Sequence, residues 1–310
     1  MLFLPYKLDI SIYRVPLLTI LVCLICLATF LFQRESGTAF ARNLRYYCNE
    51  QLDANLHAII EAIDDEHVGH HCANVFFAIR QSSNRDKEIS MLAGEVRNLE
   101  FYRDRAADLK YKEDTLKSGY ADFEALVPDP LTDKLAYKPD RYDFVTMMTS
   151  TFAHSSWEHI LGNLFFFFIF ASCVECIVGP IQFCLIFVLM AVTTSLAYSY
   201  SSSAADALPT IGLSGVAMGM MAMLTALLPQ ARIWCIFWFL LFVRRFTLPV
   251  FVIALWYIGW NVYDLQYDHS SHINYMAHVS GAITGLVLGA LYRLFAPQRL
   301  DAVTVGAGDG

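Results

Sequence analysis

Residues 210–221 read TIGLSGVAMGMM, which places Ser214 between Gly212 and Gly215 at the head of a strongly apolar run. Gly219 follows Gly215 by four residues, and this GxxxG spacing marks a helix face that a second membrane helix can approach closely. A serine that begins such a helix lies among free N–H groups at the positive end of the helix dipole, which stabilises a developing oxyanion. Because the serine can equally be a helix cap only, the stretch predicts a tightly packed membrane helix and leaves its chemistry open.

The composition of the whole chain is that of a membrane protein. Of its 310 residues, 56% are hydrophobic and 16% are charged, and the mean hydropathy is +0.43. Soluble domains carry about 25% charged residues, so this chain is poor in charge. The formal net charge is a mild −7 and no basic stripe is present, so we expect no nucleic-acid partner.

Apolar runs of about 20 residues predict six transmembrane helices. These runs cover residues 15–32, 158–178, 180–199, 212–229, 248–264 and 276–293. No cleavage site follows the first run, so we interpret it as an anchor and not as a signal peptide. A shorter apolar stretch at 233–243 ends in Arg244 and Arg245, and we interpret it as a re-entrant or interfacial segment.

The positive charges of the short loops predict the orientation of the chain. Lys and Arg precede the first run, follow the fourth and sixth runs, and are missing from the loops 200–211 and 265–275. The predicted organisation is a cytoplasmic N-terminus (1–14), a first helix (15–33), an extracytoplasmic and mostly helical domain (34–141), a core of five further helices (142–293) and a cytoplasmic tail (294–310). The predicted fold class is all-α, a six-helix membrane bundle with an extramembrane domain between helices 1 and 2.

Two cysteines, Cys48 and Cys72, fall in the predicted outer domain. They could form one disulfide if that side of the membrane is oxidising, and the sequence leaves the pairing open. The other six cysteines lie in or near apolar runs, where a thiol behaves as a small hydrophobe. The tract HVGHHC (67–72) fits no standard zinc spacing, so we predict no metal site.

Two further motifs put polar groups at the ends of other runs. His159 and Asn163, in HILGN, share one face of a helix, where they can bond to another helix or face water. His278 opens the sixth run in AHVSGAITGLVLG, at the head of a face lined by Gly281 and Gly285. If this face packs on the Ser214 helix, a nucleophile–base pair results that lacks only a third, orienting acid.

The motifs HILGN, GLSG and AHVSGAITG, in this order, resemble those of the rhomboid family of intramembrane serine proteases over about residues 142–293. The resemblance implies that Ser214 is the nucleophile and His278 the general base, without a cofactor. It implies an oxyanion hole made by the Ser214 N–H with the side chains of His159 and Asn163. The residues that it implies as structural support are His154, Glu175, Gly212, Gly215, Gly219, Gly281 and Gly285.

The chain departs from the family pattern in three places. Val145 and Thr146 stand near the position where many members carry a Trp-Arg pair, which leaves the packing of that loop open. Met218 replaces a tyrosine that stacks on the catalytic histidine in many members, and we expect its thioether to contact the ring instead. The domain at 34–141 is also much larger than the usual first loop.

We therefore interpret the chain as an intramembrane serine endopeptidase of a bacterial inner membrane that cleaves transmembrane-anchored proteins. A catalytically inactive relative that binds membrane clients is an alternative, although Ser214 and His278 are both present. A transporter that uses intramembrane histidines as a proton relay is a further alternative, but it gives no reason for the GxSG motif. The sequence leaves the substrate, the task of the outer domain and the oligomeric state open.

Overall fold

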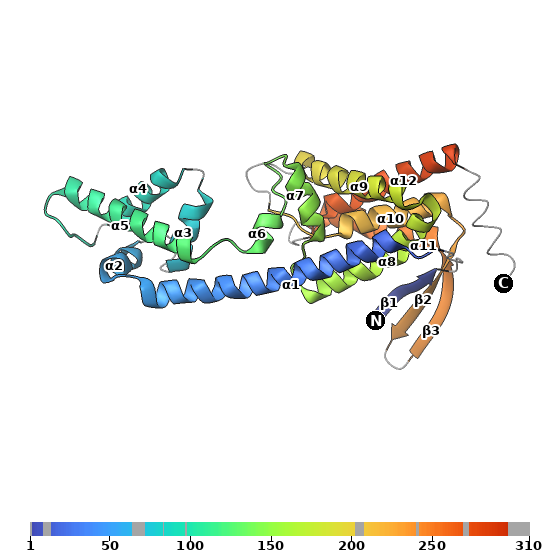
Figure 1. The fold of residues 1–310 in the computed structure, drawn as a ribbon, viewed down its shortest axis with the longest axis horizontal. Coiled ribbons are helices and arrows are strands. Elements are labelled where there is room, and N and C mark those ends of the chain that lie inside the picture. Colours follow the sequence, from blue (N-terminus) through green and yellow to red (C-terminus); the bar gives the residue numbers. More distant parts are fainter. Residues whose placement is uncertain are drawn as a thin grey trace. The chain divides into compact units, whose positions relative to one another are not determined.

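The protein divides into two compact units that are both mainly helical (Figure 1). The first consists of Met1–Gln33 with Thr132–Gly310, and the second of Arg34–Leu131. The structure, a computed structural model, describes residues 2–8, 14–63, 72–82, 84–96, 98–201, 208–239, 242–268 and 273–296. The histidines of the tract HVGHHC lie outside these described residues.

Apolar helices build the first unit. They are α1 (Leu17–Tyr46, up to Gln33), α8 (Trp157–Val178), α9 (Pro180–Ser201), α10 (Ser214–Leu227), α11 (Val250–Tyr267) and α12 (Tyr275–Phe295), with short α6 (Leu131–Leu135) and α7 (Phe144–Thr149). Within the described residues, four are long and apolar enough to cross a membrane: α1 with the turn after it, α8, α9 and α12. Since α10 has only 14 residues and α11 is not among the four, six spans stay a prediction.

A three-stranded sheet corrects the predicted all-α fold class to a mostly helical one, and the re-entrant or interfacial placement of the segment at 233–243 stays a prediction. Strands β1 (Leu2–Leu8), β2 (Arg232–Phe239) and β3 (Phe242–Pro249) pair antiparallel in the order β1-β2-β3. The stretch RIWCIFWF is rich in the aromatic and β-branched residues that favour strands, and its length fits a strand. Ile233 and Cys235, two residues apart, are both buried, so one face of β2 packs on the helices.

Helices α10 and α12 contact each other through their backbones. A Cβ atom added to Gly281 would overlap the carbonyl oxygen of Gly215, and one added to Gly285 would overlap that of Gly219. These four glycines therefore allow an approach that no other residue type permits. The heads of the two helices are brought together by this contact.

A buried carboxylate fixes the start of α1. The side chain of Glu175, near the end of α8, accepts hydrogen bonds from the N–H groups of Leu18 and Thr19 (3.0 and 2.7 Å) and from the Thr19 hydroxyl (2.7 Å). Glu175 thereby satisfies backbone donors that have no partner within α1 itself. Its place fits the supporting role that the family resemblance implies.

The second unit is a small helical domain with its own aromatic core. It contains the end of α1, a π-helical turn (Tyr47–Gln51), α2 (Ala54–Ala62), α3 (Cys72–Gln81), α4 (Arg85–Glu95) and α5 (Arg105–Leu126). Phe76 stacks on Phe123 with 4.8 Å between ring centroids. A disulfide joins Cys48 to Cys72, the pairing that the sequence left open. Among the described residues, no group of three or more His, Cys, Asp or Glu side chains could hold a metal ion.

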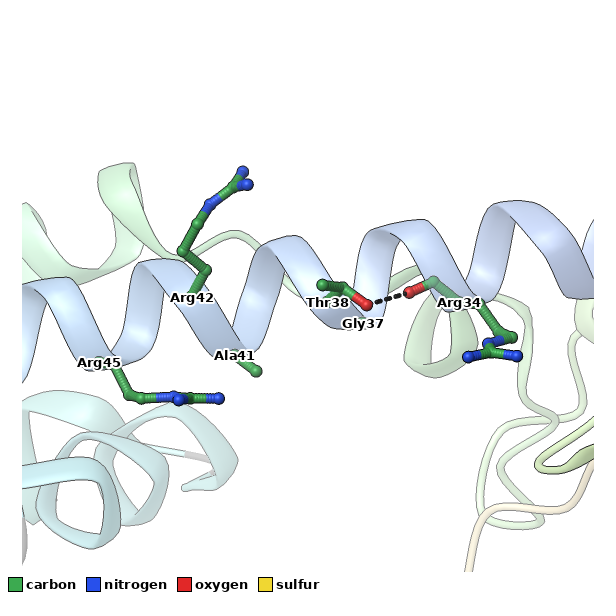
Figure 2. Close-up of a pocket in the computed structure, with 6 residues that line it drawn as sticks. All are labelled: Arg34, Gly37, Thr38, Ala41, Arg42 and Arg45. Atoms are coloured by element: carbon green, nitrogen blue, oxygen red, sulfur yellow. Dashed lines mark hydrogen bonds between the residues drawn. The ribbon is translucent and has the colours of Figure 1, made fainter.

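An open basic hollow of about 510 Å³ lies along α1 in the second unit, as Figure 2 shows. Its lining consists of Arg34, Gly37, Thr38, Ala41, Arg42 and Arg45, all from α1. The Thr38 hydroxyl donates to the Arg34 carbonyl oxygen at 2.9 Å, so this side chain is bound to its own helix. The hollow contains none of the predicted site residues.

A methyl group between α10 and α12 should destabilise the first unit. We expect Gly281→Ala to lower the free energy of unfolding by roughly 1–3 kcal/mol, because the added Cβ meets backbone that cannot move aside. The measurement is the melting temperature of the purified protein in detergent. Gly259→Ala on α11 is the matched control, since open space surrounds that position, and an equal loss in both variants would contradict the packing argument.

The second unit should lose stability in acid through Asp108. Lys112 bonds to the Asp108 carboxylate (2.6 Å), and together with the N–H groups of Phe101 and Tyr102 it lowers the pKa of that carboxyl. A carboxyl with a lowered folded-state pKa stabilises the fold above its unfolded pKa of about 4, and this contribution is lost as the pH falls. Proteolysis of the second unit in the intact protein should therefore accelerate below about pH 4 with an acid-stable protease. Asp108→Asn should reduce this pH dependence, and an unchanged profile would contradict the role of Asp108.

Candidate active site

The two residues predicted as nucleophile and base meet at the heads of α10 and α12. Ser214 is the first residue of α10, and its Oγ lies 2.7 Å from Nε2 of His278 in the first turn of α12. The side chain of Asn274 caps α12 by accepting from the Ala277 N–H at 3.0 Å, which fixes the start of the helix beside Ser214. Both side chains of the pair are partly buried.

The other ring nitrogen of His278 has a partner that the sequence analysis missed. Nδ1 lies 2.5 Å from Oδ1 of Asn261 on α11, and Asn261 Nδ2 donates to the Tyr257 carbonyl oxygen at 2.8 Å. The available signal was an amide inside an apolar run, where polar side chains are costly and functional. The ring edge of Tyr275 also faces His278, with centroids 6.3 Å apart. The expected contact from Met218 stays a prediction.

His159 presents a hydrogen-bond donor to the loop before Ser214. Its Nδ1 accepts from the Ser155 N–H (3.4 Å) and lies 3.1 Å from the Ser155 hydroxyl, so the ring proton is on Nε2. A Cβ built on Gly212 would lie 2.9 Å from this Nε2 and 3.6 Å from Nδ2 of Asn163. Gly212 has φ +127°, a conformation that only glycine adopts readily, and it leaves the space between the two donors open.

The side-chain amide of Asn163 is buried, and its nitrogen makes no hydrogen bond within the described part of the chain. The side chain is 8% exposed. A buried donor without a partner costs about 1–3 kcal/mol, so its persistence calls for an explanation. An oxygen placed over Gly212 would be within reach of Asn163, His159 and the N-terminus of α10, which is the donor set that an oxyanion needs.

His154 packs against the ring of His159. The His154 ring packs edge to face with the His159 ring, with 5.0 Å between centroids, and the backbone N–H of His154 donates to Gln33 Oε1 at 3.0 Å. Burial, with a smaller contribution from His159, lowers the pKa of His154 to about 4, so the ring is neutral at physiological pH. Gln33 also donates to the Thr132 hydroxyl at 3.0 Å, so its side chain connects α1 both to α6 and to the loop that carries His154.

The loop before α8 is ordered without the Trp-Arg pair of many relatives. Asp143 caps α7 by accepting from the N–H groups of Val145 and Thr146, both at 3.1 Å. The Ser150 carbonyl oxygen accepts from the Gly212 N–H at 2.9 Å, which fixes the loop against the site. Backbone and capping bonds therefore hold this loop in place here.

Comparison with known proteins agrees with this geometry. A family model described as the Rhomboid domain matches residues 141–295, half of the chain. Rhomboid-like protein 11, chloroplastic, from Arabidopsis thaliana is 30% identical over 169 residues. That match covers 53% of this chain and 56% of the relative, so the shared region is little more than half of either protein.

The matched region contains the three motifs HILGN, GLSG and AHVSGAITG that suggested the resemblance. It also contains α8 to α12, among them three of the helices that are able to cross a membrane. The family predicted from the motifs is therefore confirmed. The chain is an integral membrane protein, and it belongs to the rhomboid family.

Proposed function

We propose that this chain is an intramembrane serine endopeptidase that cleaves transmembrane-anchored proteins. The observation that carries the proposal is the distance of 2.7 Å between Ser214 Oγ and His278 Nε2. In the proposed reaction, Ser214 attacks a peptide carbonyl carbon while His278 takes the hydroxyl proton. The imidazolium then protonates the leaving amine, and a water molecule activated by His278 hydrolyses the acyl-enzyme.

The negative charge of each tetrahedral intermediate falls on the former carbonyl oxygen. Nε2 of His159 and Nδ2 of Asn163 both lie within 4 Å of the position that a Cβ on Gly212 would take, which is where we propose that this oxygen lies. The N–H groups at the head of α10 add the positive end of a helix dipole. These donors are held in place before substrate arrives, so they need little reorganisation during the reaction.

The short α10 supports a site beneath the membrane surface. Its 14 residues span about 21 Å, whereas the hydrocarbon core is about 30 Å thick. If the end of α10 that leads into β2 lies at one boundary, Ser214 lies about 9 Å below the other. Water can reach such a depth through the polar loop ends, and a transmembrane substrate can present its outer end there.

The distribution of charge supports a site on the side opposite the cytoplasm. Basic residues gather on the sheet and at the end of α12, away from the heads of α10 and α12: Lys7, Arg232, Arg244, Arg245 and Arg293. Cytoplasmic segments of membrane proteins carry such an excess of Lys and Arg. We therefore propose cytoplasmic termini, as in a bacterial inner membrane, although the matched relative is chloroplastic.

The disulfide of the second unit supports the same orientation. Cys48 and Cys72 are bonded, and disulfides persist in oxidising compartments. An outer location for the second unit therefore agrees with the proposed topology.

Removal of the nucleophile should abolish proteolysis. We expect Ser214→Ala to eliminate both cleavage of a single-span substrate in liposomes and labelling by a fluorophosphonate probe, while the melting temperature stays close to that of the wild type. Ser280→Ala on α12 is the matched control, because the hydroxyl of Ser280 donates back to its own helix, to the Ala277 carbonyl oxygen. Cleavage by Ser214→Ala at the wild-type rate would reject the mechanism. A wild-type protein that binds the single-span substrate but neither cleaves it nor reacts with the probe would favour the client-binding alternative.

Removal of the Asn163 side-chain amide should slow the chemical step. We expect Asn163→Ala to lower kcat by about 10²–10³-fold, since the lost donor acts on charge that develops in the transition state. KM should change little. Gly162→Ala, in open space one residue away, should keep the wild-type kcat. A raised KM with an unchanged kcat in Asn163→Ala would instead assign this side chain to substrate binding.

A further inference from the structure

We propose that Asn261 of α11 completes a Ser–His–Asn triad in this protein, as the residue that orients His278 and selects its tautomer. The proposal rests on the proposed protease function. It starts from the contact of 2.5 Å between His278 Nδ1 and Asn261 Oδ1, on the ring nitrogen that does not face Ser214. Asn261 is a positioning residue, because it acts on the substrate only through the histidine.

The second hydrogen bond of Asn261 determines which way its amide points. Nδ2 donates to the Tyr257 carbonyl oxygen, one turn earlier in α11, at 2.8 Å. A flipped amide would place Oδ1 against that carbonyl oxygen and set two acceptors against each other. Oδ1 therefore faces the histidine, and this oxygen can only accept.

The amide orientation in turn fixes the proton on His278. Because Asn261 Oδ1 accepts, Nδ1 of His278 must carry the hydrogen, and a neutral ring then leaves Nε2 without one. A bare Nε2 is the form that can take the Ser214 proton. In the opposite tautomer, Nε2–H would point at the serine and the ring would be unable to act as a base.

An amide suits this position better than a carboxylate. A carboxylate in a membrane helix is costly unless ion pairs or several hydrogen bonds satisfy its charge, whereas the amide brings an acceptor without net charge. Its oxygen still carries partial negative charge, which stabilises the imidazolium that forms during each proton transfer. Papain-like proteases use an asparagine for the same task beside a Cys–His pair, so the chemistry is feasible.

The place of Asn261 in α11 favours a specific role over general helix packing. The buried residues of α11 are Val250, Ile253 and Ala254, all near its start. Asn261 lies two turns beyond them, on a part of the helix whose other side chains are largely exposed. Hydrophobic burial is thus weak where Asn261 meets His278, and a purely structural amide would stabilise little there.

The test measures the pH dependence of Ser214 labelling by a fluorophosphonate probe in liposomes, for the wild type and two variants. We expect Asn261→Leu, similar in size but without an acceptor, to lower the labelling rate roughly 10- to 100-fold. We expect Asn261→Asp to keep most of the rate and to move the acidic limb of the profile to higher pH, because a carboxylate stabilises the imidazolium. Val262→Leu, the exposed neighbour on α11, should behave as the wild type.

Three outcomes separate this inference from the function on which it rests. If the wild type labels, Ser214→Ala does not, and Asn261→Leu labels at the wild-type rate with an unchanged pH profile, the triad is wrong and the dyad stands. If the wild type labels no faster than Ser214→Ala, both proposals fail. If Asn261→Leu melts early, Asn261→Asp decides: a shifted acidic limb supports the triad, and an unshifted one overturns it.

Discussion

The close approach of α10 and α12 is the constraint on which the site depends. Ordinary helix pairs pack with axes 8–10 Å apart because side chains separate them. Here Gly215 faces Gly281 and Gly219 faces Gly285, so backbone meets backbone. This close approach begins at the helix heads, where a serine and a histidine come within 2.7 Å of each other. The catalytic distance is therefore a consequence of helix packing.

Polar groups buried in the first unit fall into two kinds. Glu175 has three donors around its carboxylate, so both of its oxygens are hydrogen-bonded and it stabilises the start of α1. Asn163 keeps a buried donor without a partner among the described residues, which lowers stability. The first pattern is typical of a structural residue and the second of a binding residue, although the sequence presents both simply as polar residues in apolar helices.

The sequence predicted what depends on spacing along one helix, and it missed what depends on distant partners. The faces of HILGN and AHVSGAITG follow from helical periodicity, so His159, Asn163 and His278 were found. The sheet was missed because a short apolar run such as that of β2 fits a strand and a membrane segment equally well, and part of its pairing is with β1, far away in the sequence. Asn261 was missed for a related reason: a single amide in α11 gains meaning only from His278 on the next helix.

The hydrogen-bond partners of His159 and His278 give the two rings different tautomers. The Ser155 N–H can only donate, so His159 accepts at Nδ1 and carries its proton on Nε2, which makes it a donor toward the space above Gly212. Asn261 Oδ1 can only accept, so His278 carries its proton on Nδ1 and offers a bare Nε2 to Ser214. In the proposed mechanism, identical rings thus serve as an electrophile and as a base, because each tautomer is set by the bond that its Nδ1 makes.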